Sequence, residues 1–207
     1  GKHAVLVANG CDDTLFATTD EAPLPDDVDL PAPIAGFIGH LSDRIDLALL
    51  EAVAATGRSL LLVGPRQPTF ELGRMSRLLA RPNVRWVGPK PFEALPSYLR
   101  AMHVGLTPYA NTDFNRASFP LKTLEYLAGG RGFVETDLPA VRWLDSILIT
   151  AETSPDRYAA AVVRALDTPR TPALTAERRA LASRHSWAAR TAEFAAVLGL
   201  RAPAEAR

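Results

Sequence analysis

Six short apolar runs alternate with longer helical patterns along this chain, and the alternation limits the folds open to it. The runs cover residues 34–39, 59–64, 84–88, 104–108, 132–136 and 147–150. Near-continuous apolar runs bounded by turn residues are typical of strands buried on both faces of a parallel sheet. The helical patterns cover residues 43–55, 72–80, 92–102, 120–128, 155–166, 175–185 and 187–198, and residues 109–118 read as an irregular loop. The sequence therefore predicts an α/β fold, a Rossmann-like doubly wound parallel sheet closed by C-terminal helices.

The residues before the first run divide into two segments. Residues 1–20 form a stub with one strand pattern, AVLVA, and the turn Asn9-Gly10, which is too little to bury itself. Residues 21–33, EAPLPDDVDLPAP, are rich in proline and acid and read as a linker. Residues 34–207 are the predicted ligand-binding domain. We expect the stub to pack on the edge of that domain, and more protein to precede it.

Composition excludes several classes of function. Lys and Arg number 23 and so do Asp and Glu, so the zero net charge argues against a nucleic-acid partner. The single cysteine, Cys11, excludes an internal disulfide and any multi-cysteine metal site, which fits a reducing compartment. Nothing approaches the roughly 20 apolar residues of a membrane span. The expected location is cytoplasmic.

Ligands of a doubly wound sheet bind in the loops after the carboxyl ends of the strands. Gly39, Gly64 and Gly88 end three of the runs and would let a ligand approach the backbone closely. His40 could contact a phosphate or be a structural hydrogen-bonding residue. Tyr109 could offer a stacking face or pack as part of the core.

The segment 115–132, NRASFPLKTLEYLAGGRG, carries the most chemistry. Pro120 suits the first turn of a helix, and Lys122 and Glu125 then share its polar face. Lys122 would lie where free backbone N–H groups and the helix dipole attract an anion, which favours a phosphate there. The alternative is a solvated surface pair of Lys122 with Glu125. The residues themselves leave both interpretations open.

The runs FPLKTLEYLAGG and FVETDLP resemble the donor-site signature of family 4-like GT-B glycosyltransferases. Weaker similarities lie in VANGCDDTLF, GFIGHLSDRIDLALLEA, NVRWVGPKPFEALPSYL and His185-Ser186-Trp187, so the resemblance spans nearly the whole chain. It implies the C-terminal half of a GT-B fold, which binds a nucleotide diphosphate sugar for transfer, with similarity to bacterial enzymes of surface-polysaccharide assembly. It also implies no metal or other cofactor.

The resemblance assigns the acceptor to an N-terminal half that this chain lacks. The general base, and any peripheral contact with a membrane, would belong to that half. This chain alone would then bind the donor without transferring the sugar.

The family's roles carry over only where residues match. Glu125 corresponds to the second of two paired glutamates and would accept hydrogen bonds from the ribose hydroxyls. Lys122 and Arg44 would hold the diphosphate. The full set of implied nucleotide-sugar-binding residues is Gly39, His40, Arg44, Gly64, Gly88, Tyr109, Ser118, Phe119, Pro120, Leu121, Lys122 and Glu125.

Two positions depart from the family pattern. Ala117 stands where the first paired glutamate would contact the donor sugar, and Gly132 replaces a common proline. The sugar, the stereochemistry and a catalytic residue are therefore unassigned. Two alternatives remain: a GT-B-fold sugar epimerase, and a non-catalytic nucleotide-binding or partner-docking domain, which Ala117 favours.

Two geometric expectations follow from the predicted fold. The charged groups of Arg44 and Lys122 should approach one another, because both of their loops lie at the same edge of the sheet. The C-terminal helices should also expose an apolar patch where a second domain packs.

Overall fold

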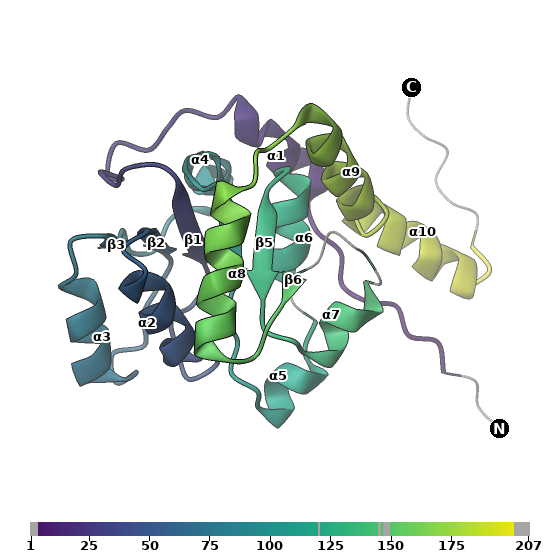
Figure 1. Ribbon diagram of the computed structural model, residues 1–207. Helices are drawn as coiled ribbons and strands as arrows, with labels where there is room; N and C mark the ends of the chain where they lie inside the picture. Colours follow the sequence, from purple (N-terminus) through teal and green to yellow (C-terminus); the bar gives the residue numbers. More distant parts are fainter. Residues whose placement is uncertain (1–3, 120, 145, 147–149, 201–207) are drawn as a thin grey trace.

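The computed structural model describes residues 4–119, 121–144, 146 and 150–200, and a six-stranded parallel sheet forms its centre (Figure 1). The strand order is β3-β2-β1-β4-β5-β6, and every pair is parallel. The strands are β1 (Ile34–Ile38), β2 (Ser59–Val63), β3 (Val84–Trp86), β4 (Val104–Thr107), β5 (Gly132–Glu135) and β6 (Thr150–Ala151). The predicted doubly wound α/β fold is confirmed. Residues 147–149 of the last predicted strand lie outside the described residues.

Helices cover both faces of the sheet (Figure 1). They are α1 (Asp13–Ala17), α2 (Leu47–Ala55), α3 (Leu72–Leu79), α4 (Leu95–Ala101), α5 (Asp113–Ala117), α6 (Leu121–Ala128), α7 (Pro139–Trp143), α8 (Pro155–Asp167), α9 (Pro172–Ser183) and α10 (Trp187–Val197), with 3-10 turns η1 (Thr18–Asp20) and η2 (Phe92–Ala94). Apolar side chains of α2, α3 and α8 form one core, and those of α1, α4, α6 and α9 form the other. The sheet lies between these two cores, and β1 and β2 are buried along their whole length.

Three short helices were not predicted: α1, α5 and α7, each of five residues. A helix of this length has too few turns to produce an apolar periodicity. Helix α2 begins at Leu47 instead of residue 43, because the side chain of Asp46 caps it by accepting a hydrogen bond from the N–H of Ala48 (3.0 Å).

The prediction of a strand at AVLVA was wrong. Residues 4–8 have no regular structure, and none of the described strands pairs with them. The chain is anchored just beyond. The N–H of Cys11 donates to the carbonyl of His185 (3.1 Å), and the N–H of Trp187 donates to the carbonyl of Cys11 (3.0 Å). Cys11 and Phe16 are buried in the second core. An extended segment needs a ladder partner to become a strand, and among the described residues the nearest pairing is one isolated bridge, between Cys11 and Ser186.

Helix α10 extends along one side of the molecule (Figure 1). It presents apolar side chains to solvent. Trp187, Phe194 and Leu198 lie on one side of it at spacings of seven and four residues. With Val197 and Leu200, they are 48–61% exposed. The expected apolar surface on the C-terminal helices is therefore present. In the described part of the chain, no helix combines the length and apolar character needed to span a membrane.

Candidate functional site

The loops after β1 and β4 meet at the carboxyl edge of the sheet. β1 and β4 are neighbours, and the chain continues from them toward opposite edges of the sheet. Two backbone hydrogen bonds join the loops, from Asp46 to the carbonyl of Pro108 (2.8 Å) and from Ala110 to the carbonyl of Arg44 (2.9 Å). Doubly wound sheets bind ligands at such a switch point, which makes this edge the candidate site.

Asn115 holds Arg44 in one orientation at the switch point. The side-chain oxygen of Asn115 accepts from Nε of Arg44 (3.1 Å), and its amide nitrogen donates to the carbonyl oxygens of Arg44 (2.9 Å) and Ala110 (2.8 Å). The guanidinium also lies 4.6 Å from the ring centre of Phe114 and 5.5 Å from that of Tyr109. None of the described residues accepts from the two terminal nitrogens of Arg44, so the fork of the guanidinium can receive an anion.

A pocket of about 690 Å³ adjoins this arginine. Arg44, Ser118, Phe119 and Leu121 from the predicted set line it, and the segment 6–9 forms another part of its wall. Its size lies within the range of about 300–1,000 Å³ that is usual for small-molecule sites. The start of the run that resembles the donor-site signature, at Phe119 and Leu121, therefore borders a space of ligand size.

Lys122 and Glu125 form the ion pair that the sequence left open, but it is not a solvated one. The Nζ of Lys122 lies 2.7 Å from Oε2 of Glu125, and the two side chains are only 22% and 11% exposed. Burial raises the pKa of Glu125, and the nearby Lys122 ammonium opposes that rise. The pair is thus largely buried at the start of α6. Each charged group needs the other to offset the cost of its own burial.

The predicted residues at the other strand ends lie along the same edge, although they do not line this pocket. The N–H of Gly64 donates to the carbonyl of Gly88 (2.8 Å). A Cβ on Gly64, whose φ is +130°, would come within 2.1 Å of the carbonyl oxygen of Gly39, so only glycine fits there. His40 is exposed beside them.

The structure thus brings four of the predicted residues around one pocket and places the Lys122–Glu125 pair in the adjoining helix. Pro120 lies outside the described residues. The close approach of the Arg44 and Lys122 charges stays a prediction, since each has its own partner, Asn115 and Glu125.

Glu135, at the end of β5, is a buried carboxyl group that sequence reasoning missed. It is 1% exposed, and its Oε2 accepts hydrogen bonds from the hydroxyls of Thr123 (2.8 Å) and Thr107 (3.4 Å). Its Oε1 has no hydrogen-bond partner among the described residues. Burial raises the pKa of Glu135 to about 8, although the two hydroxyls lower it. Near neutral pH the group is therefore mainly protonated in the folded chain.

Comparison with known proteins identifies relatives of the chain. A model of the family described as "Glycosyl transferases group 1" matches residues 32–168. A protein of Bacillus subtilis (strain 168), named as the teichuronic acid biosynthesis glycosyltransferase TuaH, is 32% identical over 144 residues. That match covers 68% of this chain and 36% of the relative, so the chain corresponds to about a third of that protein.

Solved structures share the fold at lower identity. Sucrose-phosphate synthase from Thermosynechococcus elongatus superimposes with a TM-score of 0.76 and 22% identity, over 96% of this chain and 53% of that one. HepE of Anabaena, in complex with UDP and glucose, gives a TM-score of 0.72 and 17% identity, over 94% of this chain and 56% of that one. The chain therefore spans about half the length of these proteins. Over nearly the whole of this chain, they have the same α/β fold.

Proposed function

The chain belongs to the group 1 glycosyl transferases, and on this premise we propose that it binds a nucleotide diphosphate sugar for transfer to an acceptor. The observation that carries the proposal is the fixed guanidinium of Arg44 at the rim of a 690 Å³ pocket at the switch point. Negative charge develops on the diphosphate as the sugar departs. A cation whose position is already set stabilises that charge without reorganising during the reaction.

The residues of α6 would hold the rest of the donor. The ammonium of Lys122 would contact the diphosphate, together with the free N–H groups at the start of the helix. Glu125 would accept hydrogen bonds from the ribose hydroxyls, because a largely buried carboxylate is a strong acceptor for them. Their mutual ion pair keeps both side chains in position before the donor arrives.

The relatives suggest which donors and products to test first. The structure of HepE contains UDP and glucose, which makes UDP-sugars the first choice of donor. The name of TuaH refers to teichuronic acid biosynthesis, which makes surface-polysaccharide assembly the proposed setting. A cytoplasmic location for the chain is part of this proposal.

The proposal predicts that the chain binds a nucleotide sugar more tightly than either part of it. Calorimetric titration with UDP-glucose, GDP-glucose and ADP-glucose, with phosphate and the free nucleosides as controls, measures this. We expect one nucleotide sugar to bind at least about tenfold more tightly than its nucleoside, since a diphosphate adds charge-assisted contacts. Absence of binding to all three nucleotide sugars would contradict the proposal. Arg44→Gln should weaken binding of that nucleotide sugar, because it removes the guanidinium at the rim of the pocket. Arg85→Gln, at an exposed arginine of β3, is the matched control and should leave the affinity unchanged.

We further propose that the exposed apolar side of α10 packs against an acceptor-binding half of the enzyme. Trp187, Phe194 and Leu198 each expose about half of their surface, which is unfavourable in water. Amide hydrogen exchange of α10 tests this, in the present chain and in a protein that also carries the acceptor-binding half. We expect slower exchange when both halves are present. Equal rates in the two proteins would contradict the docking.

A further inference from the structure

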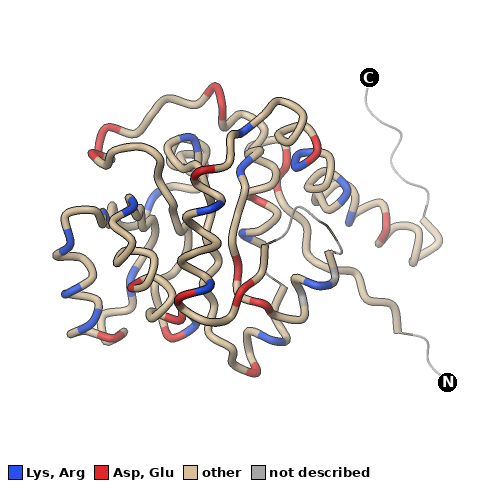
Figure 2. The backbone as a smooth tube through the Cα atoms, in the orientation of Figure 1, with Lys and Arg blue, Asp and Glu red and all other residues tan. Residues whose placement is uncertain are grey.

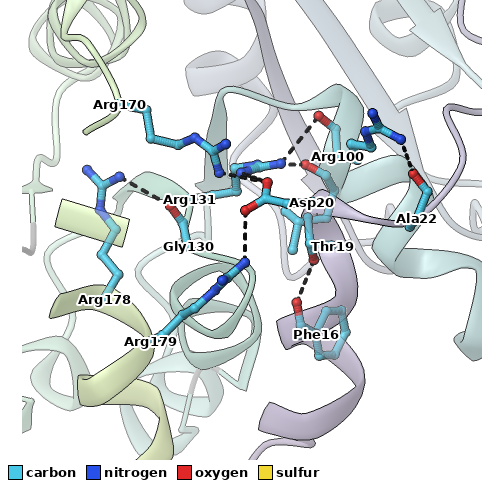
Figure 3. Close-up of polar contacts among 11 residues, drawn as sticks. Phe16, Thr19, Asp20, Ala22, Arg100, Gly130, Arg131, Arg170, Arg178 and Arg179 are labelled. Atoms are coloured by element: carbon cyan, nitrogen blue, oxygen red, sulfur yellow. Dashed lines mark hydrogen bonds and ion pairs between the residues drawn. The ribbon is translucent and has the colours of Figure 1, made fainter. Parts of the chain in front are cut away.

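Five arginines gather at the opposite edge of the sheet from the donor pocket. Basic and acidic positions are interspersed along most of the chain (Figure 2), so this gathering is local. Figure 3 shows three of its members joined to the carboxylate of Asp20, and the other two joined to backbone carbonyl groups nearby. The arginines come from separate parts of the chain: Arg100, Arg131, Arg170, Arg178 and Arg179.

Asp20 is shared by three of the five guanidinium groups (Figure 3). Its Oδ1 accepts hydrogen bonds from Arg131 (3.0 Å) and Arg170 (2.8 Å), and its Oδ2 accepts from Arg179 (2.9 Å). One carboxylate carries one negative charge, so it cannot neutralise three cations. Glu177 adds a second negative charge near Arg178. Asp167, which lines a hollow beside the cluster, is paired with Arg58. The cluster therefore keeps a positive charge after its ion pairs are formed.

The other contacts of the cluster are to uncharged carbonyl groups. Arg131, with a side chain only 4% exposed, donates from Nε to the carbonyl of Leu99 (3.0 Å), and Arg178 donates to the carbonyl of Gly130 (3.3 Å). Arg100 donates to the carbonyl of Ala22. A carbonyl oxygen satisfies a donor but leaves its charge in place. The Nε of Arg178 is buried and has no hydrogen-bond partner in the described part of the chain.

The neighbouring titratable groups reflect this positive field. Burial and the nearby Arg170 lower the pKa of Arg131 and of Arg178. Burial, together with Arg131 and Arg170, also lowers the pKa of His103. Burial is the largest cause of each pKa shift, and repulsion between like charges acts in the same direction.

Two hollows open beside the cluster, and they adjoin because His103 and Arg170 line both. One has a volume of about 280 Å³ and includes Arg100 and Arg131, and the other has about 360 Å³ and includes Arg178. Nδ1 of His103 accepts a hydrogen bond from the N–H of Ile34 (3.1 Å), so the neutral ring carries its proton on Nε2. The ring also has a hydrogen bond to the backbone of Ala101, so His103 forms part of the wall of both hollows.

We propose that the two adjoining hollows together form a site for a phosphoryl group. Arg170 and Arg178 are its direct contacts, and buried Arg131 is the fixed charge behind them. Guanidinium groups match phosphate oxygens in pairs, so Arg170 and Arg178 can hold one phosphoryl group. The site is concave and lined from α4, the start of β4, the α6–β5 turn and the α8–α9 connection, which fits a compact anion. It goes beyond the proposed function, because the donor pocket lies at the other end of the strands.

Pyrophosphate is the probe that tests the site, in calorimetric titrations at constant ionic strength set with chloride. Arg170→Gln and Arg178→Gln should each weaken pyrophosphate binding at least about tenfold, because each removes charged hydrogen bonds. Arg170→Lys keeps the charge but loses the paired hydrogen-bond geometry of a guanidinium. Its affinity for pyrophosphate should therefore lie between those of wild type and Arg170→Gln. Arg81→Gln is the matched control, since Arg81 is exposed and lies at the same end of the sheet before β3.

The donor pocket could also bind pyrophosphate, so Arg44→Ala separates the two sites. Pyrophosphate binding that persists in Arg44→Ala and is lost in Arg170→Gln supports the new site, and UDP-sugar binding should then be unchanged in Arg170→Gln. Binding that is lost only in Arg44→Ala, or that is equal in wild type, Arg170→Gln and Arg178→Gln, would overturn it.

A final arm identifies the source of the phosphoryl group. Co-sedimentation compares vesicles of phosphatidylcholine with vesicles that also contain phosphatidylglycerol. Retention on the anionic vesicles alone, lost in Arg170→Gln, would assign the site to a lipid headgroup. Pyrophosphate binding without such retention would assign it to a soluble phosphorylated compound, and the absence of both kinds of binding would overturn the proposal.

Discussion

Lys122→Ala is expected to weaken UDP binding roughly ten- to hundredfold while uridine binding changes little. A charged hydrogen bond contributes about 1.5–3 kcal/mol, and the ammonium of Lys122 is proposed to make such bonds only with the diphosphate. Uridine has no phosphate and should not respond to the lost charge. Calorimetric titration of wild type and Lys122→Ala with both ligands measures the difference.

Glu125→Gln provides the complementary result. The substitution keeps the size of the side chain but removes the anionic acceptor for the ribose hydroxyls, so UDP and uridine should weaken together. Glu193→Gln is the matched control, because Glu193 also pairs with a basic residue three positions away at 2.7 Å, on α10. It should leave both affinities unchanged.

The alternative outcome is equally specific. If Lys122 and Glu125 serve only each other, both substitutions should leave UDP and uridine affinities at wild-type values. The pair is largely buried, so breaking it would then reduce only the free energy of unfolding. That combination would end the assignment of α6 to the donor site.

The centre of the sheet could be predicted because its strands β1 and β2 are almost wholly apolar. The runs that became β1 and β2 are buried at every position, and a run of that kind fits few other folds. The segment 4–8 has a similar apolar content and is not a strand, since pairing depends on a neighbour that the local sequence does not specify. Local pattern therefore identified strands only where the tertiary fold supplied partners.

The site could be predicted in part, through residues whose neighbours in sequence are also their neighbours in space. Lys122 and Glu125 share a helix face, so their pairing was foreseeable. Asn115 and Glu135 were missed, because one holds an arginine 71 positions away and the other is buried by threonines from β4 and α6. The arginine cluster likewise joins residues that are distant in sequence, so no run of basic residues in the sequence predicts it.

The free energy of unfolding of wild type is expected to fall, relative to that of Glu135→Gln, as the pH rises from 5 to 8. The pKa of Glu135 is about 8 in the folded chain, whereas the ordinary pKa of a glutamate is 4.5. Below pH 4.5 the carboxyl is protonated in both states and carries no penalty. Between the two values the unfolded chain releases the proton and the folded chain keeps it, so stability is lost through this window.

The expected loss is on the order of 3 kcal/mol, since each pKa unit corresponds to about 1.4 kcal/mol and most of the shift lies between pH 5 and 8. Glutamine resembles the protonated acid in size and hydrogen bonding, and it cannot ionise, so Glu135→Gln should be the more stable form at pH 8. Urea unfolding of wild type, Glu135→Gln and the exposed control Glu93→Gln at both pH values measures the difference. Glu93→Gln should follow wild type at each pH. Parallel pH profiles for wild type and Glu135→Gln would show instead that the Glu135 carboxylate is accommodated in its buried position, by Thr107, Thr123 and solvent reaching Oε1.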